Sequence, residues 1–250
     1  MFKFACWQIE NIMESSEFVS EFRAAFGAIP SLPMAFYYSD KPVAETVKRG
    51  GCIFKFFPKV FLGNTVSLNA ETIGCGGGKF YTGFVDLPDC IPDFVSVKEK
   101  YKDSPEKVCR FINQIGVEKA HGKYLNFQRV DRMGHLDNIE GLIFFATPDV
   151  LSGLCSWAFF DRDEPDTVST LFGSGCSSII STIVNENRKN GYRCFLGLFD
   201  PSVRPWVDED VLSFAIPKCR LDVMMRTLPH TCLSGTSAWN KVRKRINGVM

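Results

Sequence analysis

Two short turns in this 250-residue chain combine cysteine with glycine, and both follow a predicted strand. The first turn reads Cys75-Gly76-Gly77-Gly78, and the second reads Gly173-Ser174-Gly175-Cys176-Ser177. Successive glycines after a strand let backbone N–H groups point into one concavity, which can hold an anion without any side chain. A cysteine at the start of a helix also gains reactivity, because the helix dipole stabilises its thiolate. The two turns are therefore predicted to bind a small anionic metabolite or cofactor.

Neither turn matches a named phosphate-binding fingerprint. A Walker loop ending at Gly78 and Lys79 would need a glycine and a hydroxyl where the chain has Ile73 and Phe80. The second turn reads G-x-G-x-x-S, close to the dinucleotide fingerprint, and Asp200 stands near the place of a ribose-binding acid. Its third small position is serine, however, and too little chain follows to complete a nucleotide-binding half. A structural protein whose turns only pack a helix on a sheet is an alternative.

The ten cysteines are spread along the chain without any C-x-x-C pair. The spacing of a local zinc site is therefore absent, and most of the ten are expected to be small buried hydrophobic residues. Cys52, Cys75 and Cys176 are the exceptions, because they could ligate a soft metal or an iron–sulfur cluster if they meet in space. They could also act as redox thiols. A cysteine-dependent metal or redox enzyme is thus a second hypothesis, and the cofactor stays open.

A charged candidate lies in the segment FDPSVRPWVDED. Asp200, Arg204 and Asp208 flank two prolines there, and the guanidinium of Arg204 could contact a carboxylate or phosphate of the ligand. The alternative is a structural Asp–Arg pair that holds the loop. The three histidines lie in polar segments, so a hydrolytic triad has little support.

The amino-acid composition limits the kinds of partner that we expect this protein to bind. The 29 Lys and Arg residues nearly balance the 28 Asp and Glu residues, so no strong field favours nucleic acid, which is not expected as a partner. No apolar run reaches the roughly twenty residues of a membrane span. Gln8 and Glu10 interrupt the first segment before a secretory signal could form. The protein is therefore expected to be cytoplasmic and without a membrane partner.

Helices and strands must position these turns. The spacing of four between Phe18, Phe22 and Phe26 predicts a helix that ends at Gly27. Ser104 as the N-cap and Pro105 at the first helical position predict a helix over 105–115. Further helices are predicted over 147–160, 173–191 and 218–228, and a helix or an irregular segment is predicted after Cys75. Strands are predicted over 34–40, 65–71, 124–131, 141–148, 166–172, 193–200 and 211–217. The basic tail KVRKRI is expected to be a solvated face.

These elements predict one compact α+β domain over residues 1–250, with helices packed on a mixed sheet. The similar stretches TVSLNAETIGC and TVSTLFGSGC also suggest a weak internal duplication. The two halves, about 31–100 and 139–230, would each deliver a strand into a glycine–cysteine turn. Chance similarity between short strings is the alternative.

Five stretches carry a resemblance to a known family: PVAETVKRGGC, GCGGGKFYTGF, GLIFFATPDVLSGL, FGSGCSSI and DPSVRPWVDEDVLSFAIP. Their order resembles the family called domain of unknown function 169, over most of the chain beyond the first thirty residues. The resemblance matches Cys52 to a cysteine ahead of a helix, Cys75 to a C-x-G-G-type turn and Cys176 to a turn in the second half. It implies a compact protein built around these turns and no particular activity.

Overall fold

A computed structural model describes residues 13–45, 47 and 50–249. Its sheet has seven strands in the order β2-β3-β1-β4-β7-β6-β5. The strands are β1 (Met34–Ser39), β2 (Val66–Leu68), β3 (Tyr124–Arg129), β4 (Gly141–Ala146), β5 (Val168–Ser169), β6 (Cys194–Gly197) and β7 (Leu212–Pro217). Neighbouring strands pair antiparallel except β5 and β6, which pair parallel. The sheet is therefore mixed, and the predicted α+β class is confirmed.

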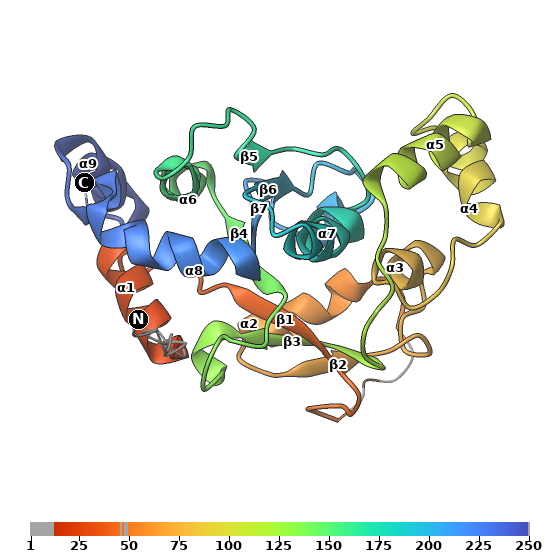
Figure 1. Cartoon of the computed structure of the whole chain (residues 1–250), viewed down its shortest axis with the longest axis horizontal. Helices are drawn as coiled ribbons and strands as arrows, with labels where there is room; N and C mark the ends of the chain where they lie inside the picture. The colour runs from red at the N-terminus through yellow and green to blue at the C-terminus, as the bar shows by residue number, and fades with distance from the viewer. Residues whose placement is uncertain (1–12, 46, 48–49, 250) are drawn as a thin grey trace, which may run out of the picture.

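Helices cover both faces of this sheet. They are α1 (Ser15–Phe26), α2 (Phe57–Phe61), α3 (Gly76–Tyr81), α4 (Cys90–Asp93), α5 (Pro105–Ile115), α6 (Pro148–Phe159), α7 (Thr182–Arg188), α8 (Lys218–Thr227) and α9 (Ser237–Ile246). Figure 1 shows α1 and α9 at one end of the molecule and α3, α4 and α5 at the other. Within the described ranges, no helix has the length and apolar character needed to cross a membrane.

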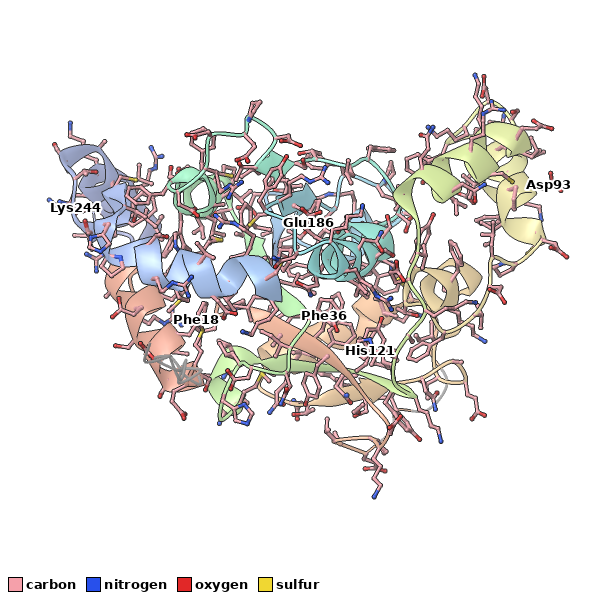
Figure 2. All side chains as sticks on the ribbon, viewed as in Figure 1. Phe18, Phe36, Asp93, His121, Glu186 and Lys244 are labelled. Atoms are coloured by element: carbon pink, nitrogen blue, oxygen red, sulfur yellow. The ribbon has the colours of Figure 1, made fainter. Side chains whose placement is uncertain are left out.

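Alternation along the central strands divides the core into two. Ile143 of β4 is buried in one hydrophobic core and its neighbour Leu142 in the other, as the two-residue period of a strand requires. The first core takes its side chains from α2, α3, α5 and α7, and it includes Phe36. The second takes them from α1, α6, α8 and α9, and it includes Phe18. Both phenylalanines are labelled in Figure 2.

The two helix signals read from the sequence are confirmed. Phe18, Phe22 and Phe26 are fully buried along α1, which ends at Gly27 with a φ of 95°. In α5 the Ser104 hydroxyl accepts a hydrogen bond from the Lys107 N–H at 3.3 Å, so the serine caps the helix. Both signals are local in the chain, which is why sequence alone could find them.

Other elements differ from the prediction. The strands expected over 65–71 and 166–172 shorten to β2 and β5, which are the two edge strands and have a pairing neighbour on only one side. The tail forms the helix α9, which the sequence did not predict. Trp239 anchors this helix to the rest of the protein. Trp239 is buried in the second core, and its indole N–H donates to the Ala25 carbonyl at 2.9 Å.

The strand order of the sheet allows the two halves of the suspected duplication to be compared. The matched strands β2 and β5 lie at opposite edges of the sheet, and each leads into a glycine–cysteine turn. One strand separates β2 from β1, whereas two strands separate β5 from β4. The two halves therefore differ in strand order, and the duplication stays a prediction.

Gly153 offers a test of how closely α6 packs against α1 and α9. A Cβ atom there would lie 2.4 Å from the Trp239 ring and 2.7 Å from the Phe26 ring. We expect Gly153→Ala to lower the free energy of unfolding by about 1–3 kcal/mol, because overpacking outweighs the gain of about 1 kcal/mol in helix propensity. The exposed Ser156→Ala on the same helix is the control, expected to change it by less than about 0.5 kcal/mol. Urea unfolding followed by circular dichroism measures both, and equal stabilities would contradict the close packing.

Candidate functional site

The segments that carry Cys52 and Cys75 lie side by side. The Gly50 N–H donates to the Thr72 carbonyl at 2.9 Å, and the Gly74 N–H donates to the Gly51 carbonyl at 3.1 Å. A Cβ atom on Gly74 would lie only 1.8 Å from the Gly50 carbonyl oxygen. The two backbones therefore approach as closely as they do because Gly74 has no side chain. Each cysteine follows directly after this contact in its own segment.

The second turn leads into a helix that begins with an irregular winding. Residues Ser177–Ser181 form a π-helical segment that continues into α7. The Ser174 hydroxyl accepts from the Ser177 N–H at 3.2 Å, and the Ser178 hydroxyl donates to the Gly175 carbonyl at 2.8 Å. Short π-helical segments inside helices occur frequently at functional sites.

This second turn packs against the segment of Cys52. A Cβ atom on Gly175 would lie 2.4 Å from a Val203 methyl group and 3.0 Å from the Phe54 ring. Phe54 is two residues after Cys52, so the turn and the Cys52 segment are in contact. Cys176 is only 7% exposed and belongs to the first core, and Cys52 is half-buried and packs against that core. The structure therefore brings Cys52 and Cys176 together as a pair of free thiols, called the thiol pair below.

The two thiols of the pair differ in acidity. The neighbouring Cys176 thiol lowers the pKa of Cys52 to about 7, against the opposing effect of burial. The Phe54 N–H and the charge of Lys55 also lower the pKa of Cys52. The proximity of Cys52, together with burial, raises the pKa of Cys176 well above its usual value. Cys52 is therefore the more acidic thiol of the pair.

The other cysteines behave differently. Burial raises the pKa of Cys155 to about 11, and it also raises the pKa values of Cys194 and Cys219. This is the ordinary effect of an apolar environment on a thiol. A lowered pKa thus distinguishes Cys52 from these three cysteines.

Cys75 lies near the thiol pair but is exposed. It caps α3, and its sulfur accepts a hydrogen bond from the Gly78 N–H at 3.4 Å. Its charge is among those that raise the pKa of Cys176. All three cysteines singled out by the sequence thus lie on neighbouring turns, with Cys75 at the surface, Cys52 half-buried and Cys176 buried.

Two further side chains face this group. Asp200 is 7% exposed and accepts hydrogen bonds from the Gly175 N–H at 3.3 Å and from the Ser202 hydroxyl at 2.7 Å. Tyr81 is also buried, and desolvation followed by the charge of Cys176 raises the pKa of its hydroxyl to about 12. The sequence drew attention to Asp200 as a ribose ligand and as one of the acids beside Arg204. It held no signal for Tyr81, whose position depends on α3 packing across the second turn.

The backbone donors proposed for an anion are largely engaged by the protein itself. In the second turn, Asp200 takes the Gly175 N–H and Ser174 takes the Ser177 N–H. In the first turn, the Gly78 N–H points to the Cys75 sulfur, whereas Gly76 and Gly77 are half-exposed. Anion binding at these turns stays a prediction of the sequence, now with fewer donors to support it.

Arg204 is held within its own loop. Its guanidinium donates to the carbonyls of Val211 at 2.5 Å, Asp208 at 3.0 Å and Glu209 at 2.7 Å. These bonds resemble the structural alternative considered from the sequence, with backbone carbonyls in place of an Asp side chain. The same loop reaches the site through Trp206, because the Lys55 ammonium lies 5.3 Å from the centre of its ring.

Metal binding by the three cysteines also stays a prediction. Over residues 13–45, 47 and 50–249, no group of three or more His, Cys, Asp or Glu side chains is arranged to hold a metal ion.

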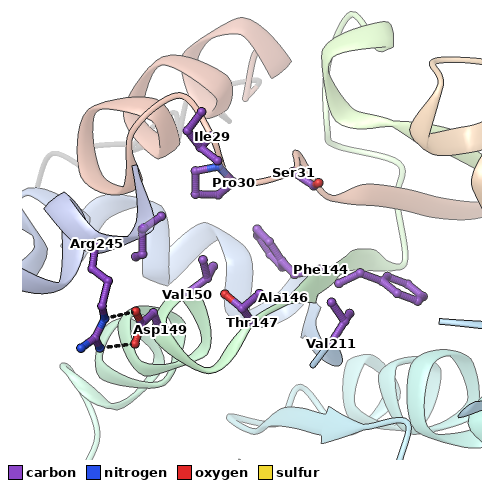
Figure 3. A pocket seen from close by; sticks show the side chains of 12 residues that line it. Ile29, Pro30, Ser31, Phe144, Ala146, Thr147, Asp149, Val150, Val211 and Arg245 are labelled. Carbon is purple, nitrogen blue, oxygen red and sulfur yellow. Dashed lines mark hydrogen bonds and ion pairs between the residues drawn. The ribbon is translucent and has the colours of Figure 1, made fainter. Parts of the chain in front are cut away.

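Two cavities lie apart from the cysteines. One, of about 320 Å³, has walls that include Ile29, Phe144 and Val150, and among its lining residues Arg245 pairs with Asp149 (Figure 3). The other, of about 250 Å³, shares residues 29–31 with the first. No residue of the two glycine–cysteine turns lines either cavity. Both are therefore separate from the thiol pair.

These features define an α+β protein in which glycine turns carry three cysteines to one side of a mixed sheet. Residues 29–227 match the model of domain of unknown function 169, a family described as uncharacterised ArCR, and the chain belongs to this family. The resemblance seen in the sequence is thereby confirmed. No curated protein and no solved structure matches the chain.

Gly74 tests the contact between the first two segments. Gly74→Ala places its Cβ 1.8 Å from the Gly50 carbonyl oxygen, so one segment must move. We expect the variant to lose about 1–3 kcal/mol of unfolding free energy. Cys52 should also lose part of its reactivity toward iodoacetamide, because the effect of Cys176 on its pKa depends on the position of its segment. Gly76→Ala, whose Cβ has no neighbour nearer than 3.7 Å, is the matched control and should leave both properties unchanged.

Proposed function

We propose that the protein carries out thiol–disulfide exchange at the thiol pair. The observation that carries the proposal is the packing of the Cys176 turn on the Cys52 segment, where a Cβ atom on Gly175 would lie 3.0 Å from the Phe54 ring. Exchange requires a thiolate that can attack and a second thiol close enough to complete the reaction. Cys52 is half-buried and Cys176 is buried, which fits Cys52 to the first role and Cys176 to the second.

The reaction begins when the Cys52 thiolate attacks one sulfur of a substrate disulfide. A bond forms between Cys52 and that sulfur, the substrate S–S bond breaks, and the other substrate sulfur leaves as a thiolate that takes up a proton. Cys176 then loses its proton and attacks the sulfur of Cys52. The second substrate thiol leaves, and a Cys52–Cys176 disulfide remains. The substrate disulfide has gained two electrons, and the protein dithiol has lost two.

The lowered pKa has a modest and measurable effect on rate. At pH 7 a thiol with a pKa of about 7 is roughly half thiolate, whereas an ordinary cysteine is a few per cent thiolate. Intrinsic nucleophilicity falls as the pKa falls, which removes part of this gain. The net advantage of Cys52 at pH 7 is therefore about three-fold. At high pH the advantage reverses, because every thiol is then ionised.

Two other functions from the sequence remain hypotheses. The half-exposed Gly76 and Gly77 beside Cys75 support a small anionic ligand, and the neighbouring positions of Cys52, Cys75 and Cys176 support a soft metal or an iron–sulfur cluster. Elemental analysis and the absorption spectrum of the purified protein test the metal hypothesis.

Removing the Cys176 thiol tests the electrostatics of the thiol pair. We expect Cys176→Ala to raise the pKa of Cys52, because the Cys176 thiol is the largest cause of its lowered value. Iodoacetamide labelling of Cys52, followed by mass spectrometry from pH 6 to 10, should then be about three-fold slower at pH 7 and faster than in the wild type at pH 10. The exposed Cys90 in the same sample is the internal reference. Overlapping pH profiles for the two proteins would contradict the proposal.

The exchange reaction itself predicts a defined product. We expect one equivalent of a small disulfide, such as oxidised glutathione, to convert the wild type to a Cys52–Cys176 disulfide. Cys52→Ser should form neither this bond nor the glutathione adduct at position 52, whereas Cys176→Ser should stop at the mixed disulfide on Cys52. Blocking of free thiols and peptide mapping identify each species. A wild-type protein that yields adducts only on exposed cysteines such as Cys90 and Cys232 would refute the proposal.

A further inference from the structure

We propose that Cys75 is a third exchange thiol, which takes the disulfide over from the thiol pair and presents it to an external dithiol reductant. This inference rests on the proposed exchange at Cys52 and Cys176. It concerns the return of the protein to its dithiol form, which the first reaction leaves undone.

Cys75 lies beside the thiol pair. The hydrogen bonds between Gly50 and Thr72 and between Gly51 and Gly74 fix the Cys75 segment against the Cys52 segment. Cys75 follows directly after the closest point of this contact, where Gly74 meets the Gly50 carbonyl. Its charge also acts on the Cys176 thiol. Cys75 is therefore held beside the pair by backbone contacts rather than by its own side chain.

Cys75 is also more exposed than either thiol of the pair. The Cys176 sulfur is buried, and Cys52 is only half-accessible, so a disulfide between them presents little surface to a protein reductant. Cys75 is exposed at the start of α3. A disulfide that includes Cys75 would place one of its sulfur atoms at the surface. Exchange requires that the attacking thiolate reach a sulfur, so access favours such a bond as the one that is reduced.

The order of steps follows from the leaving groups. Attack of the Cys75 thiolate on the Cys176 sulfur forms a Cys75–Cys176 bond, breaks the Cys52–Cys176 bond and releases Cys52 as a thiolate. Cys52 is the better leaving group of the pair, because a thiol of lower pKa leaves faster. This step moves the disulfide without net oxidation.

An external dithiol then completes the cycle. Its thiolate attacks the exposed Cys75 sulfur, and Cys176 leaves and takes up a proton. The second thiol of the reductant attacks the mixed disulfide, and Cys75 leaves as a thiolate. The reductant ends as a disulfide and has supplied the two electrons that restore the protein.

Two variants of exposed cysteines test the relay on the full chain. Cys75→Ser keeps a favourable residue at the start of α3, so the fold should persist, and circular dichroism checks this. Cys90→Ser, which removes another exposed thiol, is the matched control. Each protein is first oxidised to the Cys52–Cys176 disulfide and then reduced either with a thioredoxin or with the small phosphine tris(2-carboxyethyl)phosphine. Cys75→Ser should slow reduction by thioredoxin about ten-fold and leave reduction by the phosphine within about two-fold of the wild type.

A third variant isolates the new bond. Cys52→Ser, oxidised with one equivalent of diamide, should form a Cys75–Cys176 disulfide that peptide mapping identifies. The relay is overturned if this bond does not form, or if Cys75→Ser and the wild type are reduced by thioredoxin at equal rates. If the wild type forms no Cys52–Cys176 disulfide, the proposed exchange fails. If that bond forms and Cys75 has no effect, the relay alone fails.

Discussion

The close approach of two backbone segments at Gly74 is the constraint on which the cysteine site depends. A side chain at this position would collide with the Gly50 carbonyl, and the hydrogen bonds of Gly50 and Gly51 to the second segment would break. Those bonds align the start of the Cys52 turn with the start of α3. The first core then fixes the second turn against Phe54 through Gly175. Two glycines at points of contact thus hold three turns at distances that no side chain on those glycines would permit.

Several opposing effects set the pKa values of Cys52 and Cys176. Their relative sizes differ between the two thiols. Burial raises the pKa of both thiols, and so does the charge of Asp200. For Cys52 the neighbouring Cys176 thiol is the largest effect, and the Phe54 N–H and Lys55 add to it, so the net shift is downward. For Cys176 the proximity of Cys52 and burial act in the same direction, upward. The two neighbouring thiols therefore differ in acidity, and the proposed exchange reaction makes use of this difference.

Sequence predicts what is local in this protein. The phenylalanine stripe of α1, the Ser104 cap and the strands β1, β3, β4 and β7 follow from short-range patterns. The sequence also singled out Cys52, Cys75 and Cys176, through their neighbouring glycines. It did not show which of them pack together, because the contact between Gly175 and Phe54 joins residues more than a hundred positions apart. Trp239 shows the same limit, since the basic sequence of α9 conceals a core contact with Ala25.

The glycines of the second turn were expected to hold an anion with their backbone N–H groups. The Gly175 N–H does bind an anion, the carboxylate of Asp200, which the chain supplies from the start of its own β6–β7 connection. This bond draws the Asp200 loop onto the turn, so that Val203 closes over Gly175 and Trp206 meets Lys55 beside Cys52. The physical principle behind the sequence prediction, an anion held by backbone N–H groups, therefore operates here within the protein. Its effect is to enclose Cys176, and this burial adds to the effect of Cys52 in raising the pKa of the Cys176 thiol.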